Sequence, residues 1–74
     1  MNGIILDKNL IAVKSSEAIK LAEGEEFKVV INKVIYLCKV ESKRAVIERG
    51  FRFMRIRLVC LSHPEIKVTE YSNI

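Results

Sequence analysis

Apolar and polar residues alternate along most of this chain, in short runs that are separated by turn-forming residues. Successive side chains of a strand point to opposite faces of a sheet, so a period of two predicts strands rather than helices. Strands are expected at residues 3–6, 10–13, 27–31, 34–40, 45–48, 51–61 and 66–71. The last of these strands is expected to lie at an edge of the sheet.

The connections between the expected strands carry typical turn residues. Residues 7–9 are expected to join the first two strands. Asn32 and Lys33 are expected to form a hairpin turn in which Asn32 takes the positive φ that such turns need. Because the glycine that usually follows such an asparagine is absent, one long bent strand is the alternative. Residues 41–44 and 49–50 are expected to form two further turns.

One short helix is expected at about residues 16–23, in the stretch "KSSEAIKLAEG". Ser15 or Ser16 can accept the first free backbone amides as an N-cap, and Gly24 fits a left-handed stop. So short a helix is not stable alone in water, so we expect it to pack on the sheet.

The length of 74 residues predicts a single domain spanning 1–74. We expect an α+β fold that is mainly antiparallel β, a small curled sheet or barrel of five to seven short strands with one short helix. Half of the residues are hydrophobic, which is high for a chain that can bury only a small core. We therefore expect a homodimer that covers part of the apolar surface.

The net charge of +4 is concentrated in the second half of the chain. Residues 1–37 contain five basic and five acidic residues, whereas residues 38–74 contain eight basic and four acidic residues. All five arginines lie between Arg44 and Arg57. Arginine suits planar, bidentate contact with phosphate or carboxylate, so an acidic partner is expected at this segment. A solvated charged face is the alternative.

The start of the chain lacks the basic and apolar regions of a signal peptide, and the longest clean apolar run, residues 34–38, is far too short to span a membrane. A cytoplasmic protein without a membrane partner is therefore expected.

Residues 6–40 contain, in order, an acidic residue, a short strand, a lysine, a helix, a Gly-acidic pair and two apolar strands. The residues that carry this order are Asp7, Ile11, Val13, Lys14, Ala18, Ile19, Leu21, Gly24, Glu25, Phe27, Val29, Ile31, Val34, Ile35 and Leu37. The order resembles the AbrB/MazE type of swapped-hairpin domain, although Asn9 and Leu10 replace the Gly-Arg pair of that family. The resemblance implies an interlocked homodimer that binds DNA through basic residues near the first strands, here Lys8 and Lys14.

The stretch "RGFRFMRI" at residues 49–56 resembles the RNP1 strand of RNA-recognition motifs through Arg49, Gly50, Phe51 and Phe53. The resemblance implies base stacking on the two phenylalanines and phosphate contacts from the arginines. Too few residues follow Leu61 for the second helix and last strand of that fold.

The phenylalanines of this strand have two possible placements. In a regular strand Phe51 and Phe53 share one face with Arg55 and Arg57. A β-bulge near Phe53 would instead turn both rings into the core and leave the arginines outside. Because the chain has only three phenylalanines and no tryptophan, we expect both rings in the core.

Cys38 and Cys60 fall on the apolar faces of their strands, so reduced core residues are expected, with a disulfide as the alternative if the strands are neighbours. Cys60 and His63 have the spacing of metal ligands, but a fourth ligand is missing, so no metal site is expected. No catalytic constellation and no cofactor motif is recognisable, so the protein is not expected to be an enzyme or to hold a cofactor.

The sequence therefore predicts a non-enzymatic nucleic-acid-binding protein, a small regulator or chromatin-type protein that binds DNA rather than RNA. The predicted contact residues lie in the segment 43–57 and are Lys43, Arg44, Arg49, Arg52, Arg55 and Arg57. The alternative is a protein–protein interaction module or a small accessory or scaffold subunit that oligomerises through exposed strands and apolar surface.

Overall fold

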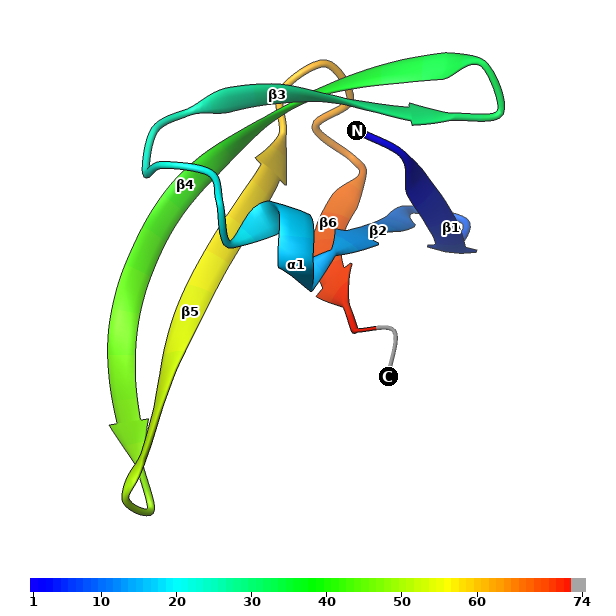
Figure 1. The fold of residues 1–74 in the computed structure, drawn as a ribbon. Helices are drawn as coiled ribbons and strands as arrows, with labels where there is room; N and C mark the ends of the chain where they lie inside the picture. Colours follow the sequence, from blue (N-terminus) through cyan, green and yellow to red (C-terminus); the bar gives the residue numbers. More distant parts are fainter. Residues whose placement is uncertain (73–74) are drawn as a thin grey trace.

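Six strands and one short helix follow each other in a computed structural model, which describes residues 1–72 (Figure 1). The elements are β1 (Gly3–Asp7), β2 (Leu10–Lys14), α1 (Ser15–Ala18), β3 (Glu26–Ile31), β4 (Val34–Glu48), β5 (Phe51–Cys60) and β6 (Lys67–Tyr71). The strands form one sheet in the order β1-β2-β6-β5-β4-β3. The prediction of a small β-rich fold with one short helix is confirmed.

The sheet is mixed, because β2 and β6 run parallel while the other neighbouring strands are antiparallel. The N–H of Lys67 donates to the carbonyl of Asn9 at 2.8 Å where the parallel pairing begins. β6 therefore lies inside the sheet, between β2 and β5, and the prediction that it is an edge strand was wrong. A parallel pair needs a long connection, and the whole segment from α1 to β5 supplies it here.

The two edge strands, β1 and β3, approach each other and almost close the sheet into a barrel. Asn2 forms an isolated bridge with Val30, whose N–H donates to the carbonyl of Met1 at 2.8 Å. The approach requires a glycine at position 3, since a Cβ there would lie 2.6 Å from Cγ1 of Val29.

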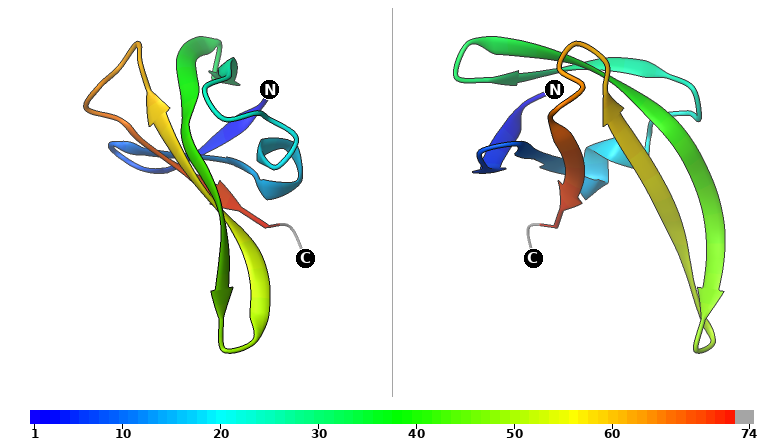
Figure 2. Two further views of the ribbon diagram at one scale, coloured as in Figure 1. Left: turned by 90° about the vertical axis from the view of Figure 1, so that its left-hand side faces the viewer. Right: turned by 180° about the vertical axis from the view of Figure 1, so that it is seen from behind.

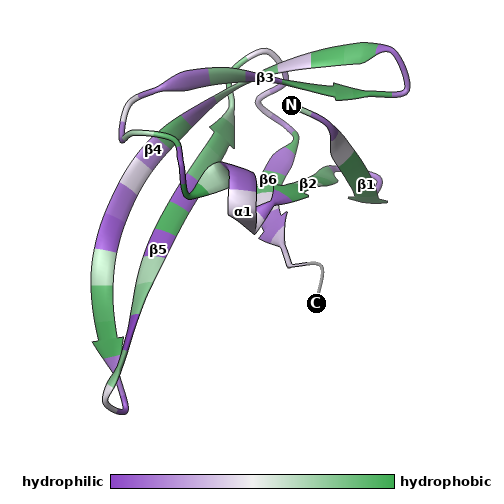
Figure 3. Ribbon diagram, viewed as in Figure 1, coloured by the Kyte–Doolittle hydropathy of each residue, from purple (hydrophilic) through white to green (hydrophobic). Residues whose placement is uncertain are grey.

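One hydrophobic core lies inside this curled sheet. Its buried members are Ile11, Val13, Ala18, Phe27, Val29, Ile31, Cys38, Val40, Leu58 and Cys60. Buried and exposed residues alternate strictly along β3, which confirms the strand expected at 27–31. Figure 3 shows further apolar residues at the far end of the β4–β5 hairpin, well away from this core.

The helix is shorter than predicted and spans only Ser15–Ala18 instead of 16–23. Its N-cap is Lys14, and no side chain caps it, so the prediction of a serine cap was wrong. The residues after the helix bind β4 instead: the N–H of Gly24, at φ 84°, donates to the carbonyl of Val40 at 2.8 Å. Within residues 1–72, no helix is long and apolar enough to cross a membrane.

The predicted turn at residues 41–44 does not exist, because β4 continues from Val34 to Glu48. A register shift between Val40 and Ser42 marks a bulge in β4, and the polar residues beyond it lie on a two-stranded ribbon where both faces are open to solvent. The predicted hairpin turns at Asn32-Lys33 and Arg49-Gly50 are confirmed, since all four residues have positive φ.

Candidate nucleic-acid interface

The outer part of the β4–β5 hairpin, residues 42–57, projects from the barrel as a twisted two-stranded arm (Figure 2). We name this segment the arm. In the described chain β3 pairs with β4 only as far as Lys39, and β6 pairs with β5 only at Leu58 and Val59. The two strands of the arm therefore pair with each other and with no other strand of residues 1–72.

The register of the arm sorts its side chains onto two faces. Residues opposite each other in an antiparallel pair share a face, so Arg44 and Arg55 lie side by side, next to the pair Ser42 and Arg57. We name the face that carries these three arginines the basic face. The pairs Val46–Phe53 and Glu48–Phe51 continue it toward the tip of the arm.

The expectation that both phenylalanines join the core was wrong, because Phe51 is 75% exposed and Phe53 is 40% exposed. The register of β5 is regular from Phe51 to Arg57, and the bulge lies in β4 instead. The arm reaches past the core, so neither face of its outer half is covered. The regular-strand alternative, with aromatic and basic residues on one face, is the arrangement that the structure shows.

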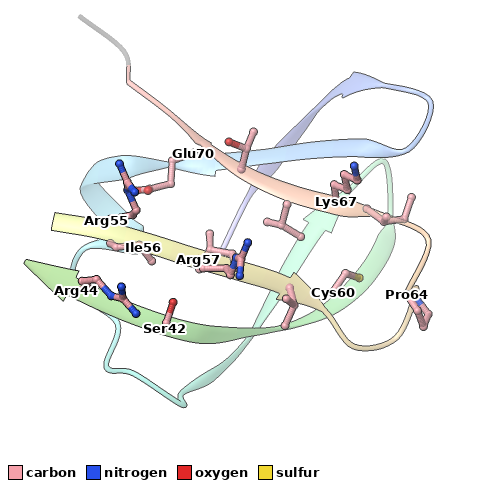
Figure 4. A pocket seen from close by; sticks show the side chains of 14 residues that line it. Ser42, Arg44, Arg55, Ile56, Arg57, Cys60, Pro64, Lys67 and Glu70 are labelled. Carbon is pink, nitrogen blue, oxygen red and sulfur yellow. The ribbon is translucent and has the colours of Figure 1, made fainter. Parts of the chain in front are cut away.

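An open groove of about 930 Å³ lies beside the arm, where β5 and β6 diverge beyond their two paired residues (Figure 4). Its charged lining residues are Arg44, Arg55, Arg57, Lys67 and Glu70. Figure 4 shows the three arginines reaching from β4 and β5 and the other two from β6. The groove thus gathers four basic side chains and one acidic side chain.

The ion pairs of the basic face are weak. Arg55 lies 3.6 Å from Oε1 of Glu48, and Arg57 lies 3.8 Å from Oε1 of Glu41. All four side chains are at least half exposed, so solvent and salt screen both pairs and each contributes little to stability. Arg44 has no acidic partner among residues 1–72. The guanidinium groups are therefore available to an external anion.

Glu70, the acidic residue of the groove, is partly buried. Burial raises the pKa of Glu70, and a hydrogen bond with the side chain of Ser15 partly opposes this rise.

The predicted contact residues divide into two groups. Arg44, Arg55 and Arg57 come together at the groove. Arg49 lies in the turn at the tip of the arm, and Arg52 lies on the opposite face, where it pairs in register with Ile47.

Lys43 has a structural contact instead. Its Nζ donates to the carbonyls of Ile19 at 2.7 Å and Leu21 at 2.9 Å, and its N–H donates to Oε1 of Glu23 at 3.1 Å. The lysine thereby joins the root of the arm to the segment that follows α1. Its charge is directed at backbone carbonyls and away from the groove.

Sequence reasoning missed Lys67, which the structure adds to the groove. Lys67 pairs in register with Val59 of β5, and Val59 pairs with Lys39 of β4, so two lysines flank one valine across the sheet. No local signal could have indicated this placement, because it depends on the pairing of β6 with β5.

The two cysteines are register partners on β4 and β5, and both are buried and free. Burial raises the pKa of Cys38 to about 12, and the neighbouring thiol of Cys60 adds to the rise. His63 is held by Ser62, whose Oγ lies 2.8 Å from Nδ1. Within residues 1–72, no three His, Cys, Asp or Glu side chains are grouped so that they could hold a metal ion.

The tip of the arm carries exposed apolar side chains. Phe51 is 75% exposed, Ile47 is 66% exposed, and Phe53 and Met54 are each 40% exposed. The guanidinium of Arg55 lies 5.9 Å from the centroid of the Phe53 ring. Phe51 and Phe53 lie on the basic face and Ile47 and Met54 on the opposite face, and exposed apolar surface on a projecting element is typical of an interaction site.

No protein-family model, no curated protein and no solved structure matches this chain. The resemblances to AbrB/MazE-type domains and to the RNP1 strand therefore rest on sequence motifs and stay predictions.

Proposed function

We propose that the protein binds nucleic acid, with duplex DNA favoured over RNA, through the basic face of the arm together with Lys67. One observation carries the proposal: Arg44, Arg55 and Arg57 lie on one face of a projecting ribbon. Their only acidic partners within residues 1–72 are two exposed glutamates, at 3.6 and 3.8 Å. A guanidinium group binds phosphate oxygens through two parallel N–H donors, which suits contacts to a nucleic-acid backbone.

The shape of the arm favours DNA. The major groove of B-form DNA is about 12 Å wide and admits a two-stranded β-ribbon, whereas the major groove of A-form RNA is too deep and narrow for side chains to read. With the ribbon lying along the major groove, its arginines can contact phosphates on the groove walls. Phe51 and Phe53, which lie on the same face as these arginines, can make apolar contacts with base edges such as the thymine methyl group.

The proposed protein is non-enzymatic and acts as a small regulator or chromatin-type protein. We place it in the cytoplasm, where free thiols such as those of Cys38 and Cys60 persist. Phosphate contacts carry no sequence information by themselves, so the arginines would position the protein and the side chains of the tip would supply any base preference.

The test measures binding to duplex DNA, single-stranded DNA and double-stranded RNA by fluorescence anisotropy, over a salt series from about 50 to 200 mM. Duplex DNA should bind most tightly, and its affinity should fall steeply with salt. The double variant Arg55→Ala with Arg57→Ala should lower the slope of log affinity against log salt by about 2, because two phosphate contacts are lost.

Arg52→Ala serves as the matched control for Arg57→Ala. Each variant removes one positive charge from β5, but the two charges lie on opposite faces of the arm. Arg57→Ala should lower the slope by about 1, and Arg52→Ala should leave it unchanged. Absence of binding at low salt, an affinity that does not depend on salt, or equal effects of the two variants would each refute the proposal.

A protein interaction module remains the second candidate function, and the exposed tip of the arm favours it. Ile47 and Phe51 are more exposed than side chains of their size usually are in a chain without partners. If the protein binds no nucleic acid but self-associates in light scattering, the second function is supported over the first.

A further inference from the structure

We propose that two copies of this chain pair through the free edges of their β5 strands, antiparallel, with Met54 opposite the partner's Met54. The pairing would join two arms into one four-stranded sheet around a two-fold axis. It goes beyond nucleic-acid binding and does not depend on it, because every argument below concerns protein contacts alone.

The hydrogen bonds of Lys43 show which backbone groups face the free edge of β5. The N–H of Lys43 points away from β5, since it donates to Oε1 of Glu23. Lys43 is the register partner of Ile56, and both members of such a pair direct their N–H and C=O groups outward. By the alternation of an antiparallel ladder, Met54 and Arg52 also direct theirs outward.

This edge is open along the whole arm. Within the described residues, β6 pairs with β5 only at Leu58 and Val59, so the outward groups of Ile56, Met54 and Arg52 pair with no strand. A row of unpaired N–H and C=O groups is a template for another strand. The corresponding edge of β4 is less accessible, because Glu23 already accepts the outward N–H of Lys43.

The order of residues in β5 suits antiparallel pairing with itself at one register. With Met54 at the centre, Phe53 lies opposite the partner's Arg55 and Arg52 lies opposite the partner's Ile56. Phe51 then lies opposite the partner's Arg57. Every arginine from 52 to 57 therefore faces an apolar side chain, and the two aromatic rings face guanidinium groups, an arrangement that favours cation–π contact.

Neighbouring registers bring like charges together. Only residues whose backbone groups face the partner can pair with each other, so the register can move only in steps of two residues. One such step places Arg55 opposite the partner's Arg55, and the step in the other direction places Arg57 opposite the partner's Arg49. Like charges directly opposite each other on adjacent strands are destabilising. The sequence thus selects the register centred on Met54, which is also a residue whose backbone groups face outward.

The groove between β5 and β6 gives space for the tip of the second arm. In the proposed register the partner's Phe51 lies opposite Arg57, one of the residues that line the groove. Phe51 and Phe53 of each copy would each pack beside an arginine of the other copy. The two-fold axis would also place both basic faces on the same side of the joined sheet, which doubles the surface that carries arginines.

The first test compares two proline variants by light scattering without nucleic acid. Met54→Pro removes the central outward N–H of β5, and Ala45→Pro removes the outward N–H of its register partner on β4. Neither N–H bonds across the β4–β5 ladder, so circular dichroism should report folded protein for both variants. The parent chain and Ala45→Pro should be dimers, and Met54→Pro should dissociate at least about tenfold more readily.

A second test remains decisive if Met54→Pro fails to fold. In the proposed dimer Met54 and the partner's Met54 form a hydrogen-bonded pair, and such pairs have Cα atoms about 5.5 Å apart, within the range of a disulfide. Met54→Cys should therefore form a cross-linked dimer under mild oxidation, whereas Ala45→Cys should not. A monomeric parent chain, a dimer that persists in folded Met54→Pro, or cross-linking by Ala45→Cys alone would overturn the proposed pairing.

Discussion

Arg44 of β4 and Arg55 of β5 stand directly opposite each other on the same face of the arm. In such a pair the Cβ atoms are about 5 Å apart, and like charges at this distance destabilise the folded state. Solvent reduces the repulsion, because both side chains are exposed. The pair does not help the chain to fold, and under the proposed function it would bind an anion between the two guanidinium groups.

Replacement of Arg44 should weaken DNA binding without lowering the stability. Arg44→Thr removes the like-charge pair and introduces a residue that suits a strand, so the free energy of unfolding in urea should stay the same or rise by about 0.5 kcal/mol. The affinity for duplex DNA should fall, and its salt slope should drop by about 1. A variant that is less stable but binds DNA normally would contradict the role given to this residue.

Replacement of Lys43 should lower the stability and leave DNA binding unchanged. Lys43→Ala removes the Nζ donor from the carbonyls of Ile19 and Leu21, and should lower the free energy of unfolding by about 1 kcal/mol. The salt slope of DNA binding should not change, since this lysine lies away from the groove. Lys20→Ala, an exposed lysine next to the same segment, serves as the control and should leave stability unaltered.

The raised pKa of Cys38 predicts a loss of stability at alkaline pH. The pKa of its thiol rises from 9.0 to about 12 on folding, so between these pH values the unfolded chain releases a proton that the folded chain keeps. The free energy of unfolding should therefore fall as the pH rises through this window. Urea unfolding at about pH 8 and pH 10.5 should show a larger decrease for the parent chain than for Cys38→Ala. Equal decreases would mean that Cys38 titrates normally.

Gly3 is the position where the almost closed barrel tolerates no side chain. A Cβ at this position would meet Cγ1 of Val29 at 2.6 Å and the carbonyl of Ala12 at 2.9 Å. Gly3→Ala should lower the free energy of unfolding by about 1 to 3 kcal/mol, because the backbone of β1 must shift. Ser16→Ala, at an exposed position, should change it little, and a Gly3→Ala variant of full stability would show that β1 does not close onto β3.

Local features of the fold could be predicted from neighbouring residues. The alternation of apolar and polar residues indicated the strand β3, and Asn32-Lys33 and Arg49-Gly50 indicated turns. Polar residues at 41–44 suggested a turn by the same logic, and this prediction was wrong. Polar residues indicate a turn only where a strand at the same place would have to be buried. Both faces of the arm are exposed to solvent, so polar residues there are compatible with a strand.

The sequence by itself determined that the chain is rich in strands, where the hairpins turn, and that the net positive charge lies between residues 38 and 74. These properties depend on residues that are adjacent in the chain. Only the tertiary structure decided that β6 pairs with β2, that the bulge lies in β4, and that Lys67 joins three of the six predicted residues at one groove. Each of these depends on the register between distant strands, and a shift of one residue moves every side chain to the other face.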